Sequence, residues 1–219
     1  MTPGRATRKP AAAPPPGHAD PVIIRPSPLP APDPAGLDPG ARSQRVRTSP
    51  RLAPDGAIRP SSYGEVVEIL FSVRDPREPD ARRCLEAYIS ELGSRFDAGF
   101  DPALSISATE EEMTPPAGLF LIATLDGEPV GCGALKFHGE APAEVKRMWV
   151  AQSARGLGLG RRVLAELEAR AAAHGVRVLR LETNRSLREA IGLYRSAGYR
   201  EVTAFSDEPY AHHWFEKSL

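Results

Sequence analysis

Three glycines in six residues form the segment of this sequence best suited to bind a ligand. They lie in the run Arg155-Gly156-Leu157-Gly158-Leu159-Gly160, between a strand candidate that ends at Val150 and a helix candidate that begins near Gly160. Glycine lets the backbone approach a ligand closely and adopt left-handed dihedrals. Unpaired N–H groups at the start of a helix, together with the helix dipole, attract anions. The run therefore predicts a phosphate-binding loop, to which Arg155, Arg161 and Arg162 add positive charge.

Three kinds of glycine loop compete for this assignment. A P-loop ends in Gly-Lys-Ser/Thr, whereas Arg161 and Arg162 follow Gly160 here. A dinucleotide fingerprint needs a third glycine three residues after the second, and position 161 is Arg. That fingerprint also belongs to an N-terminal βαβ unit, whereas this loop follows four strand candidates. The first two kinds therefore do not fit, and the third is considered below.

The elements that must position this loop follow from hydrophobic periodicity. We expect strands over residues 66–73, 119–124, 130–137, 144–150, 176–181, 199–205 and 212–217. Helices are expected from Pro79, from about Gly160 to His174, and over 186–197, with a short further helix or irregular chain over 96–107. Asp126-Gly127 is typical of a hairpin turn. The order predicts a mixed α/β sheet and not a repeating βαβ array.

The chain divides into two parts by composition. Residues 1–62 hold fifteen of the 23 prolines, and we expect a disordered Pro/Ala/Arg-rich tail there, followed by one domain over 63–219. The formal net charge is zero, but the first 60 residues carry nine Arg/Lys and four Asp/Glu, against 19 and 24 in the rest. A modestly acidic domain favours an amine substrate over nucleic acid.

The sequence does not favour a disulfide-bonded, metal-binding, membrane or secreted protein. Cys84 and Cys132 lie in apolar runs without disulfide or metal spacing, so we expect buried thiols. His138, His212 and His213 form no ligand pattern, and we expect no metal. No apolar stretch could span a bilayer and the start lacks the apolar core of a secretory signal, so we expect a cytoplasmic protein without membrane contacts.

Two signatures in the expected order resemble one known family. The spacing Arg155-x-x-Gly158-x-Gly160 after a strand ending at Val150 resembles the pyrophosphate loop of the GCN5-related N-acetyltransferases, the GNAT family. The segment 189–199, EAIGLYRSAGY, resembles the second signature of that family, Ala-Ile-x-Leu-Tyr-x-x-x-Gly-Phe/Tyr. The resemblance covers roughly residues 64–219. It implies the GNAT-like acyl-CoA N-acyltransferase fold, an α/β fold whose central mixed sheet has splayed middle strands and flanking helices.

The resemblance also implies acetyl-CoA as co-substrate and a place for each part of it. The pyrophosphate would lie on the N–H groups of the loop, and the pantetheine arm would run along the end of the central strand as an additional strand between two splayed neighbours. The signature's usual asparagine is replaced by Leu187; Asn184 lies nearby and could substitute, or could cap the strand end. The implied cofactor-binding residues are Met148, Trp149, Val150, Arg155, Gly156, Leu157, Gly158, Leu159, Gly160, Arg161 and Asn184.

Acetyl transfer to an amine needs a base, because alkyl ammonium groups keep their proton to about pH 10. The resemblance implies Tyr194 as general acid near the sulfur, the alternative being a buried tyrosine whose hydroxyl bonds the backbone. Glu144, at the start of the central strand, is the candidate base, matching a glutamate of histone-modifying members; Glu182 is the second candidate. Either could instead be a surface carboxylate. The oxyanion would bind a backbone N–H near Met148 or Trp149.

Strand alternation predicts which side chains of residues 144–150 share a face. Glu144, Lys146, Met148 and Val150 should lie on one face, and Val145, Arg147 and Trp149 on the other.

The acceptor pocket should form from the region after the first helix and the last hairpin. The candidates there are Phe96, Asp97, Phe100, Asp207, Glu208 and Tyr210. The leading hypothesis is an N-acetyltransferase that acts on a small amine or amino acid. A protein or peptide acceptor, or a non-catalytic acyl-CoA-binding regulator, are the alternatives, and proteins that resemble this one are commonly homodimers.

Overall fold

The computed structural model describes residues 42–47 and 66–219. They form one sheet of eight strands in the order β1-β2-β3-β4-β5-β6-β8-β7, in which only β5 and β6 are parallel neighbours. The strands are β1 (Arg42–Arg47), β2 (Val66–Arg74), β3 (Gly118–Leu125), β4 (Glu128–His138), β5 (Ala141–Val150), β6 (Val178–Thr183), β7 (Arg200–Val202) and β8 (His213–Ser218). The predicted mixed α/β sheet is confirmed.

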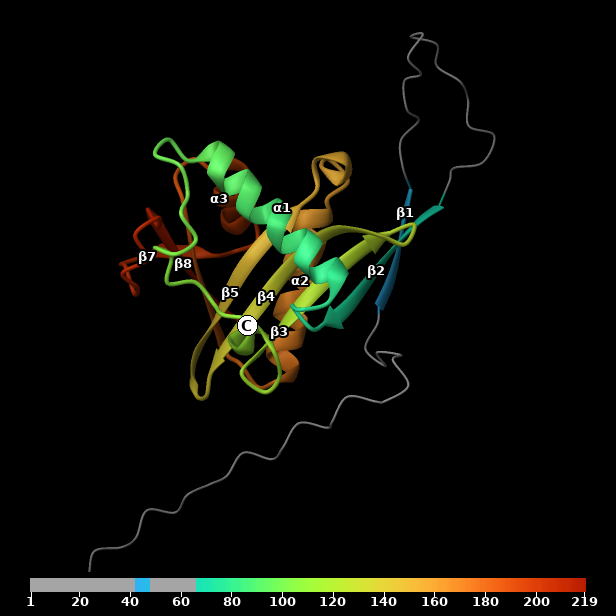
Figure 1. Cartoon of the computed structure of the whole chain (residues 1–219). Coiled ribbons are helices and arrows are strands. Elements are labelled where there is room, and N and C mark those ends of the chain that lie inside the picture. The colour runs from blue at the N-terminus through green and yellow to red at the C-terminus, as the bar shows by residue number, and fades with distance from the viewer. Residues whose placement is uncertain (1–41, 48–65) are drawn as a thin grey trace, which may run out of the picture.

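Three α-helices accompany the sheet: α1 (Pro79–Arg95), α2 (Leu159–Ala173) and α3 (Arg188–Ser196). Both α1 and α2 pack on β3, β4 and β5, from opposite faces (Figure 1). Gly133 permits the close approach of α2, because a Cβ there would lie 2.7 Å from Leu167 Cδ1. This glycine therefore lets α2 pack closely against β4.

Most predicted elements appear within one or two residues of their expected bounds. β5 begins three residues earlier than expected, β6 begins two residues later, and β7 has three residues instead of seven. Residues 96–107 form irregular chain with turns and no helix, one of the two predicted alternatives. The turn at Asp126-Gly127 has positive φ at both residues, as the hairpin signal predicts. Cys84 and Cys132 are buried free thiols on the α1 side, also as predicted.

Six residues of the amino-terminal stretch have regular structure. Arg42–Arg47 forms β1, which pairs antiparallel with β2 over six residue pairs. The expectation of a disordered tail is therefore wrong for these six residues. The edge of β2 offers them backbone hydrogen bonds, which cannot be predicted from composition. The rest of residues 1–62 lies outside the described part.

A β-bulge interrupts β5 and corrects the predicted alternation. Lys146 pairs with Ala134 and Trp149 with Cys132, so three steps on β5 match two on β4. Arg147 adopts φ 56°, in the left-handed region. Because the extra residue reverses the phase of the strand, Lys146 and Trp149 share the α1 face.

The second half of β5 therefore has its side chains on the faces opposite to those expected. Met148 and Val150 pack with Val145 in the core on the α2 face. Glu144 pairs with Lys136 and so lies on the α1 face with Lys146. The predicted set of Glu144, Lys146, Met148 and Val150 on one face is wrong beyond Lys146.

The parallel neighbours β5 and β6 separate soon after they meet. They pair only at Ala143–Leu179 and Glu144–Arg180. From Val145 onward, the edge of β5 that faces β6 has no strand partner among residues 42–47 and 66–219. β6 instead pairs along its other edge with β8. The predicted splay of the middle strands is thus present, and it opens a gap in the sheet.

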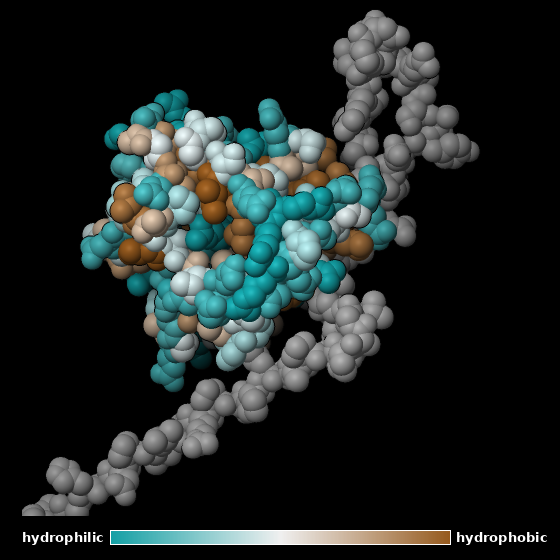
Figure 2. Space-filling view, viewed as in Figure 1, coloured by the Kyte–Doolittle hydropathy of each residue, from teal (hydrophilic) through white to brown (hydrophobic). Residues whose placement is uncertain are grey.

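The surface is largely hydrophilic on the face drawn in Figure 2, with apolar residues showing mainly in the middle of that face and at one side. Among the described residues, the large apolar side chains with the most exposure are Leu70, Leu104, Ile106 and Leu219. None of the helices in the described ranges is long and apolar enough to cross a bilayer.

Candidate active site

Two cavities meet where β5 and β6 separate. The larger, of about 1250 Å³ including space open to solvent, lies against the glycine loop and is called the glycine-loop cleft. The smaller, of about 680 Å³ on the same measure, is called the aromatic cavity because Phe96, Phe100 and Tyr210 line it. Six residues line both cavities, so the two are continuous at Tyr88, Leu92, Met148, Leu187, Ala190 and Tyr194.

The glycine-loop cleft is built largely from backbone. Gly156 and Gly158 have φ of 81° and 73°, a conformation that costs other residues free energy. Gly158 is the N-cap of α2 and supplies no side-chain hydrogen bond, so the first N–H groups of the helix remain for a ligand. Of the predicted cofactor residues, Met148, Trp149, Val150, Arg155, Gly156, Gly158, Leu159, Gly160 and Arg161 line this cleft. Leu157 lines neither cavity.

An ionic network connects α1 to the loop and to α3 across this cleft. The Arg155 guanidinium donates to Glu91 Oε2 at 2.5 Å, and Arg95 donates to Glu91 Oε1 at 3.3 Å and to Glu189 at 2.6 Å. Trp149 Nε1 also donates to Glu91, at 3.0 Å. Sequence reasoning missed Glu91, which partly neutralises the arginine expected to meet the pyrophosphate.

Tyr194 lies at the junction of the two cavities. Its ring is buried against Tyr199 and Phe215, and its hydroxyl has no hydrogen-bond partner within the described ranges. The alternative of a structural tyrosine bonded to the backbone therefore gains no support from the geometry. Burial raises the pKa of the phenol, so it stays protonated and can donate a proton at neutral pH.

Lys146 joins the two candidate bases in one ionic chain. Its Nζ contacts Glu144 Oε2 at 2.6 Å and Glu182 Oε1 at still closer range, across the gap between β5 and β6. Burial alone would lower the pKa of Lys146, but Glu182 and Glu144 raise it overall. The lysine is therefore an ammonium that holds the split strands together.

The two candidate bases differ in their access to the cavities. Glu182 lines the aromatic cavity, whereas Glu144 lines neither cavity. The second Glu144 oxygen lies 3.0 Å from His138 Nε2. Burial acts to raise the pKa of Glu144, but the charge and hydrogen bond of Lys146, with smaller contributions from His138 and Lys136, lower it overall.

Glu208 is a third carboxylate at the site, buried on the wall of the aromatic cavity. Its Oε2 accepts hydrogen bonds from Ser105 Oγ at 3.0 Å and from the Ile106 N–H at 2.9 Å. Its Oε1 accepts the Tyr210 N–H at 3.3 Å. No Lys, Arg or His in the described ranges forms an ion pair with it.

Asn184 lies in the aromatic cavity and not in the glycine-loop cleft. Its Nδ2 donates to the Tyr210 carbonyl at 2.8 Å, and its Oδ1 accepts from the N–H and hydroxyl of Ser186 at 2.9 and 2.8 Å. These bonds match the strand-end cap that the sequence left open as an alternative to a pantetheine contact.

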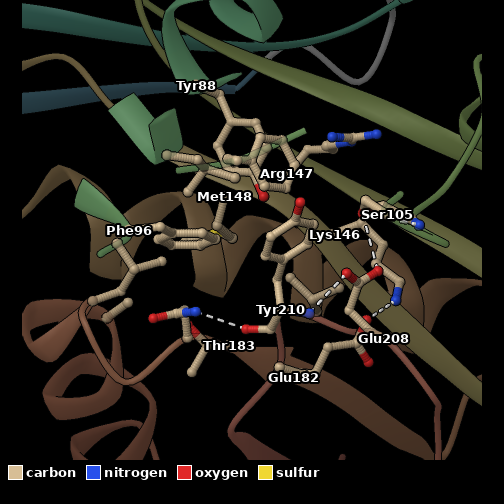
Figure 3. Close-up of a pocket in the computed structure, with 18 of the residues that line it drawn as sticks. Tyr88, Phe96, Ser105, Lys146, Arg147, Met148, Glu182, Thr183, Glu208 and Tyr210 are labelled. Carbon is tan, nitrogen blue, oxygen red and sulfur yellow. Dashed lines mark hydrogen bonds and ion pairs between the residues drawn. The ribbon is translucent and has the colours of Figure 1, made fainter. Parts of the chain in front are cut away.

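The wall of the aromatic cavity contains four of the six predicted pocket residues. Phe96, Phe100 and Tyr210 pack with ring centroids 4.8 to 5.8 Å apart, and Glu208 lies beside them (Figure 3). Asp97 and Asp207 do not line it. His212 and His213 are also outside both cavities, and no metal-binding cluster occurs in the described ranges.

Arg147 lines the aromatic cavity, although sequence reasoning placed it only on a strand face with Val145 and Trp149 and did not assign it to the pocket. Its guanidinium stacks on the Tyr88 ring, 5.6 Å from the centroid, and Nη2 donates to the Ala108 carbonyl at 3.3 Å. No sequence signal could have found it, because the bulge of β5 decides its direction.

Comparison with known proteins agrees with this geometry. Residues 83–199 match the model of the acetyltransferase (GNAT) family. The chain is 40% identical over 138 residues to a protein of Azospirillum brasilense named IAA acetyltransferase, a match that covers 63% of this chain and 88% of that protein. It is 34% identical over 147 residues to an uncharacterized N-acetyltransferase of Schizosaccharomyces pombe, covering 65% of this chain and 86% of that one.

Solved structures share the fold. A proposed acyl-CoA N-acyltransferase from Klebsiella pneumoniae has a TM-score of 0.55 and 29% identity, over 68% of this chain and 96% of that chain. A GNAT acetyltransferase from Staphylococcus aureus has a TM-score of 0.58 at 17% identity, over 68% and 99%. The chain belongs to the GNAT acetyltransferase family, and it is an N-acetyltransferase.

Proposed function

We propose that this enzyme transfers an acetyl group from acetyl-CoA to the primary amine of a small, amino-acid-like molecule. The observation that carries the proposal is the meeting of two cavities at Tyr194, in the gap between β5 and β6. One cavity has a backbone socket for a diphosphate, and the other has polar and aromatic side chains. Such a pair of cavities can hold two substrates with their reacting groups together.

Acetyl-CoA fits the glycine-loop cleft. Its pyrophosphate would accept hydrogen bonds from the loop and the start of α2. Its pantetheine amides would pair with the edge of β5 that β6 leaves open, along Met148, Trp149 and Val150. This placement brings the thioester to the junction beside Tyr194. A solved aminoglycoside 6'-N-acetyltransferase with the same fold, in complex with coenzyme A, is consistent with it.

The reaction can then proceed by direct attack. The neutral amine nitrogen attacks the acetyl carbonyl carbon, and a backbone N–H at the bulge, near Met148, stabilises the oxyanion. When the carbon–sulfur bond breaks, the CoA thiolate takes the Tyr194 proton, and solvent later returns a proton to the phenolate. The proton lost by the amine goes to a carboxylate or to a water that the carboxylate orients.

Three carboxylates are candidates for this proton acceptor. Glu144 remains a candidate from the family resemblance, but its two oxygens are held by Lys146 and His138. Glu182 lines the aromatic cavity and is paired with Lys146. We propose Glu208, because it is buried on the cavity wall and forms no ion pair with a cation in the described ranges.

A small acceptor fits better than a protein segment. Two loops are tied together over the aromatic cavity, since Glu208 bonds Ser105 and Ile106, and the Asp101 N–H donates to the Tyr210 hydroxyl at 2.9 Å. This connection between the loops favours a compact acceptor over an extended peptide. Protein or peptide acetylation is the alternative.

The test begins with binding and proceeds to turnover. Acetyl-CoA should raise the melting temperature of the protein, and a panel of amines should then release free thiol from it. Acetylated product should form in equal amount to the thiol. Binding without release for every small amine and peptide would indicate a non-catalytic acyl-CoA-binding regulator, and release with peptides alone would indicate a protein acetyltransferase.

A further inference from the structure

We infer that the acceptor carries a carboxylate bound by Arg147, and that it is a free amino acid with an aromatic or large apolar side chain. This inference rests on the proposed function and names the substrate class of the same site.

The charges on the wall of the aromatic cavity match an amino acid. Four charged residues line it: Lys146, Arg147, Glu182 and Glu208. Lys146 is paired with Glu182 and also with Glu144, which lies outside the cavity. Arg147 and Glu208 remain, and neither forms an ion pair within residues 42–47 and 66–219. The cavity therefore presents one unmatched cation and one unmatched anion, the complement of a zwitterion.

Arg147 is held ready for an anion. Its Nε is buried without a hydrogen-bond partner in the described structure, and only Nη2 has an acceptor, the Ala108 carbonyl. The Tyr88 ring fixes the guanidinium plane from one side (Figure 3). A guanidinium presents parallel donors that match the two oxygens of a carboxylate. A carboxylate in the cavity would accept from the terminal nitrogens of the guanidinium, since these, unlike Nε, are not among the fully buried atoms that lack a partner.

The position of Arg147 also suits an α-amino acid. It follows Lys146 and precedes Met148 in the bulge, and its stacking partner Tyr88 lines both cavities. Arg147 thus directly precedes Met148, a residue of the junction where the thioester would lie. A carboxylate one carbon away from the amine can therefore contact Arg147 while the amine faces the junction and Glu208.

Apart from Arg161, which lines the glycine-loop cleft and donates only to Ser196, the other cations that line the two cavities are already paired. Lys146 contacts two carboxylates, Glu144 and Glu182. Arg155 and Arg95 lie in the glycine-loop cleft and pair with Glu91. Arg147 is therefore the cation of the aromatic cavity with capacity left for an acceptor carboxylate.

The apolar part of the acceptor has a place on the aromatic wall. Phe96, Phe100 and Tyr210 form a tilted cluster beside Leu92 and Tyr88, which offers ring faces and edges to an apolar group. Aromatic rings in such tilted arrangements attract each other beyond the effect of burial. This wall favours phenylalanine, tryptophan or leucine over glycine or serine.

The decisive experiment compares matched acceptors that differ in the carboxylate. Thiol release is measured with phenylalanine and phenethylamine, and with leucine and isoamylamine. The wild-type enzyme should prefer each amino acid over its decarboxylated amine by about 10-fold or more in kcat/KM, the range expected for a charged hydrogen-bonded contact. Phenylalanine should also exceed glycine.

Variants of Arg147 then test whether this residue causes the preference for amino acids over their decarboxylated amines. Arg147→Gln should lower the ratio of phenylalanine to phenethylamine by about 10- to 100-fold, mostly through KM for the amino acid. Arg147→Lys keeps the positive charge but loses the two parallel N–H donors of the guanidinium, so its ratio of phenylalanine to phenethylamine should be intermediate. This variant is measured in place of Arg147→Gln if the glutamine variant does not fold. Arg82→Gln, on the exposed side of α1, is the matched control and should retain the wild-type ratio.

Each alternative result overturns a different statement. Thiol release that is equally fast with and without the carboxylate, or a ratio unchanged in Arg147→Gln, would refute the carboxylate inference and leave the acetyltransferase proposal standing. Acetyl-CoA binding without thiol release for any amine would refute the proposed function itself.

Discussion

The two cavities that meet at Tyr194 are made in different ways. The glycine-loop cleft takes about half of its wall from one stretch, residues 148–161, and the rest from α1 and α3, and the groups that we propose bind the diphosphate are backbone amides of a loop and a helix start. The aromatic cavity takes its wall from side chains of α1, the 96–107 loop, β5, β6, α3 and the loop before β8. A ligand common to a family can be bound by local backbone geometry, whereas an individual acceptor requires side chains gathered from distant segments.

The cavities also differ in how their charges are balanced. In the glycine-loop cleft, Arg155 and Arg95 pair with Glu91 and Glu189, and Arg161 donates only to Ser196, so a bound diphosphate would compete with protein carboxylates for two of the three arginines. The aromatic cavity leaves Arg147 and Glu208 unmatched within the described residues. The affinity for the cofactor should therefore depend on ion pairs within the protein, whereas the affinity for the acceptor should depend on its direct contacts with Arg147 and Glu208.

The largest effect should come from the residue shared by both cavities. Tyr194→Phe keeps the ring but removes the proton for the CoA thiolate, so kcat should fall by about 10²- to 10³-fold. KM for acetyl-CoA should change little, because the ring contacts persist. Steady-state thiol release measures both constants.

Tyr199→Phe is the matched control, since Tyr199 is equally buried but lines neither cavity. Its kcat should stay within about twofold of wild type, because the catalytic loss is expected only where a phenol can donate a proton. Equal kcat in the two variants would mean that Tyr194 is structural.

A glycine substitution should distinguish the two cavities. Gly158→Ala places a side chain at φ 73°, which costs about 1–2 kcal/mol and shifts the loop away from its anion-binding shape. We expect KM for acetyl-CoA to rise by about 10-fold while KM for the amine stays constant.

Gly175→Ala is the matched control for this backbone strain. Gly175 has φ 80° and, like Gly158, open space where a Cβ would lie, but it follows the carboxyl end of α2, away from both cavities. Both variants should melt at lower temperature, and only Gly158→Ala should weaken acetyl-CoA binding. A rise in KM for the amine in Gly158→Ala would contradict the proposal that the two cavities bind different substrates.

A smaller effect should follow from the ion pair in the glycine-loop cleft. Glu91→Gln removes the carboxylate that holds Arg155 at 2.5 Å, and so exposes the Arg155 charge to the pyrophosphate. The dissociation constant of acetyl-CoA should fall by about three- to fivefold, the range of a partly exposed ion pair. Calorimetry at two salt concentrations measures it; weaker binding would show that Glu91 positions Arg155.

The smallest effect concerns stability and pH. The pKa of Glu144 is lowered in the folded state, because Lys146 and its neighbours outweigh burial. Its contribution to stability is therefore present above the unfolded pKa of about 4.3 and is lost as the pH falls through the lower folded value.

Glu144→Gln should accordingly reduce the free energy of unfolding by about 1 kcal/mol at pH 7. The difference should shrink below about pH 4, as the wild-type carboxylate becomes protonated. Urea titrations at the two pH values measure it, with the exposed Glu140→Gln as control. A difference that grows at low pH would contradict the lowered pKa.

Sequence reasoning was most successful where function depends on a short stretch of chain. The glycine loop, the helix it opens and the place of Tyr194 on α3 all follow from local spacing, and the structure brings them to one cleft. Of the residues expected at the acceptor pocket, Phe96, Phe100, Glu208 and Tyr210 line the aromatic cavity, but Asp97 and Asp207 do not. The sequence can show which loops lie near a pocket, but it cannot show which of their side chains line the cavity.

The sequence by itself determined the family, the anion-binding loop and the order of strands and helices, because periodicity and glycine dihedrals are properties of neighbouring residues. Only the tertiary structure decided which way the side chains of β5 point. That direction depends on one extra residue in its pairing with β4, at Arg147, and pairing is set by a strand elsewhere in the chain. The same bulge turns Arg147 toward the aromatic cavity, where the acceptor is selected.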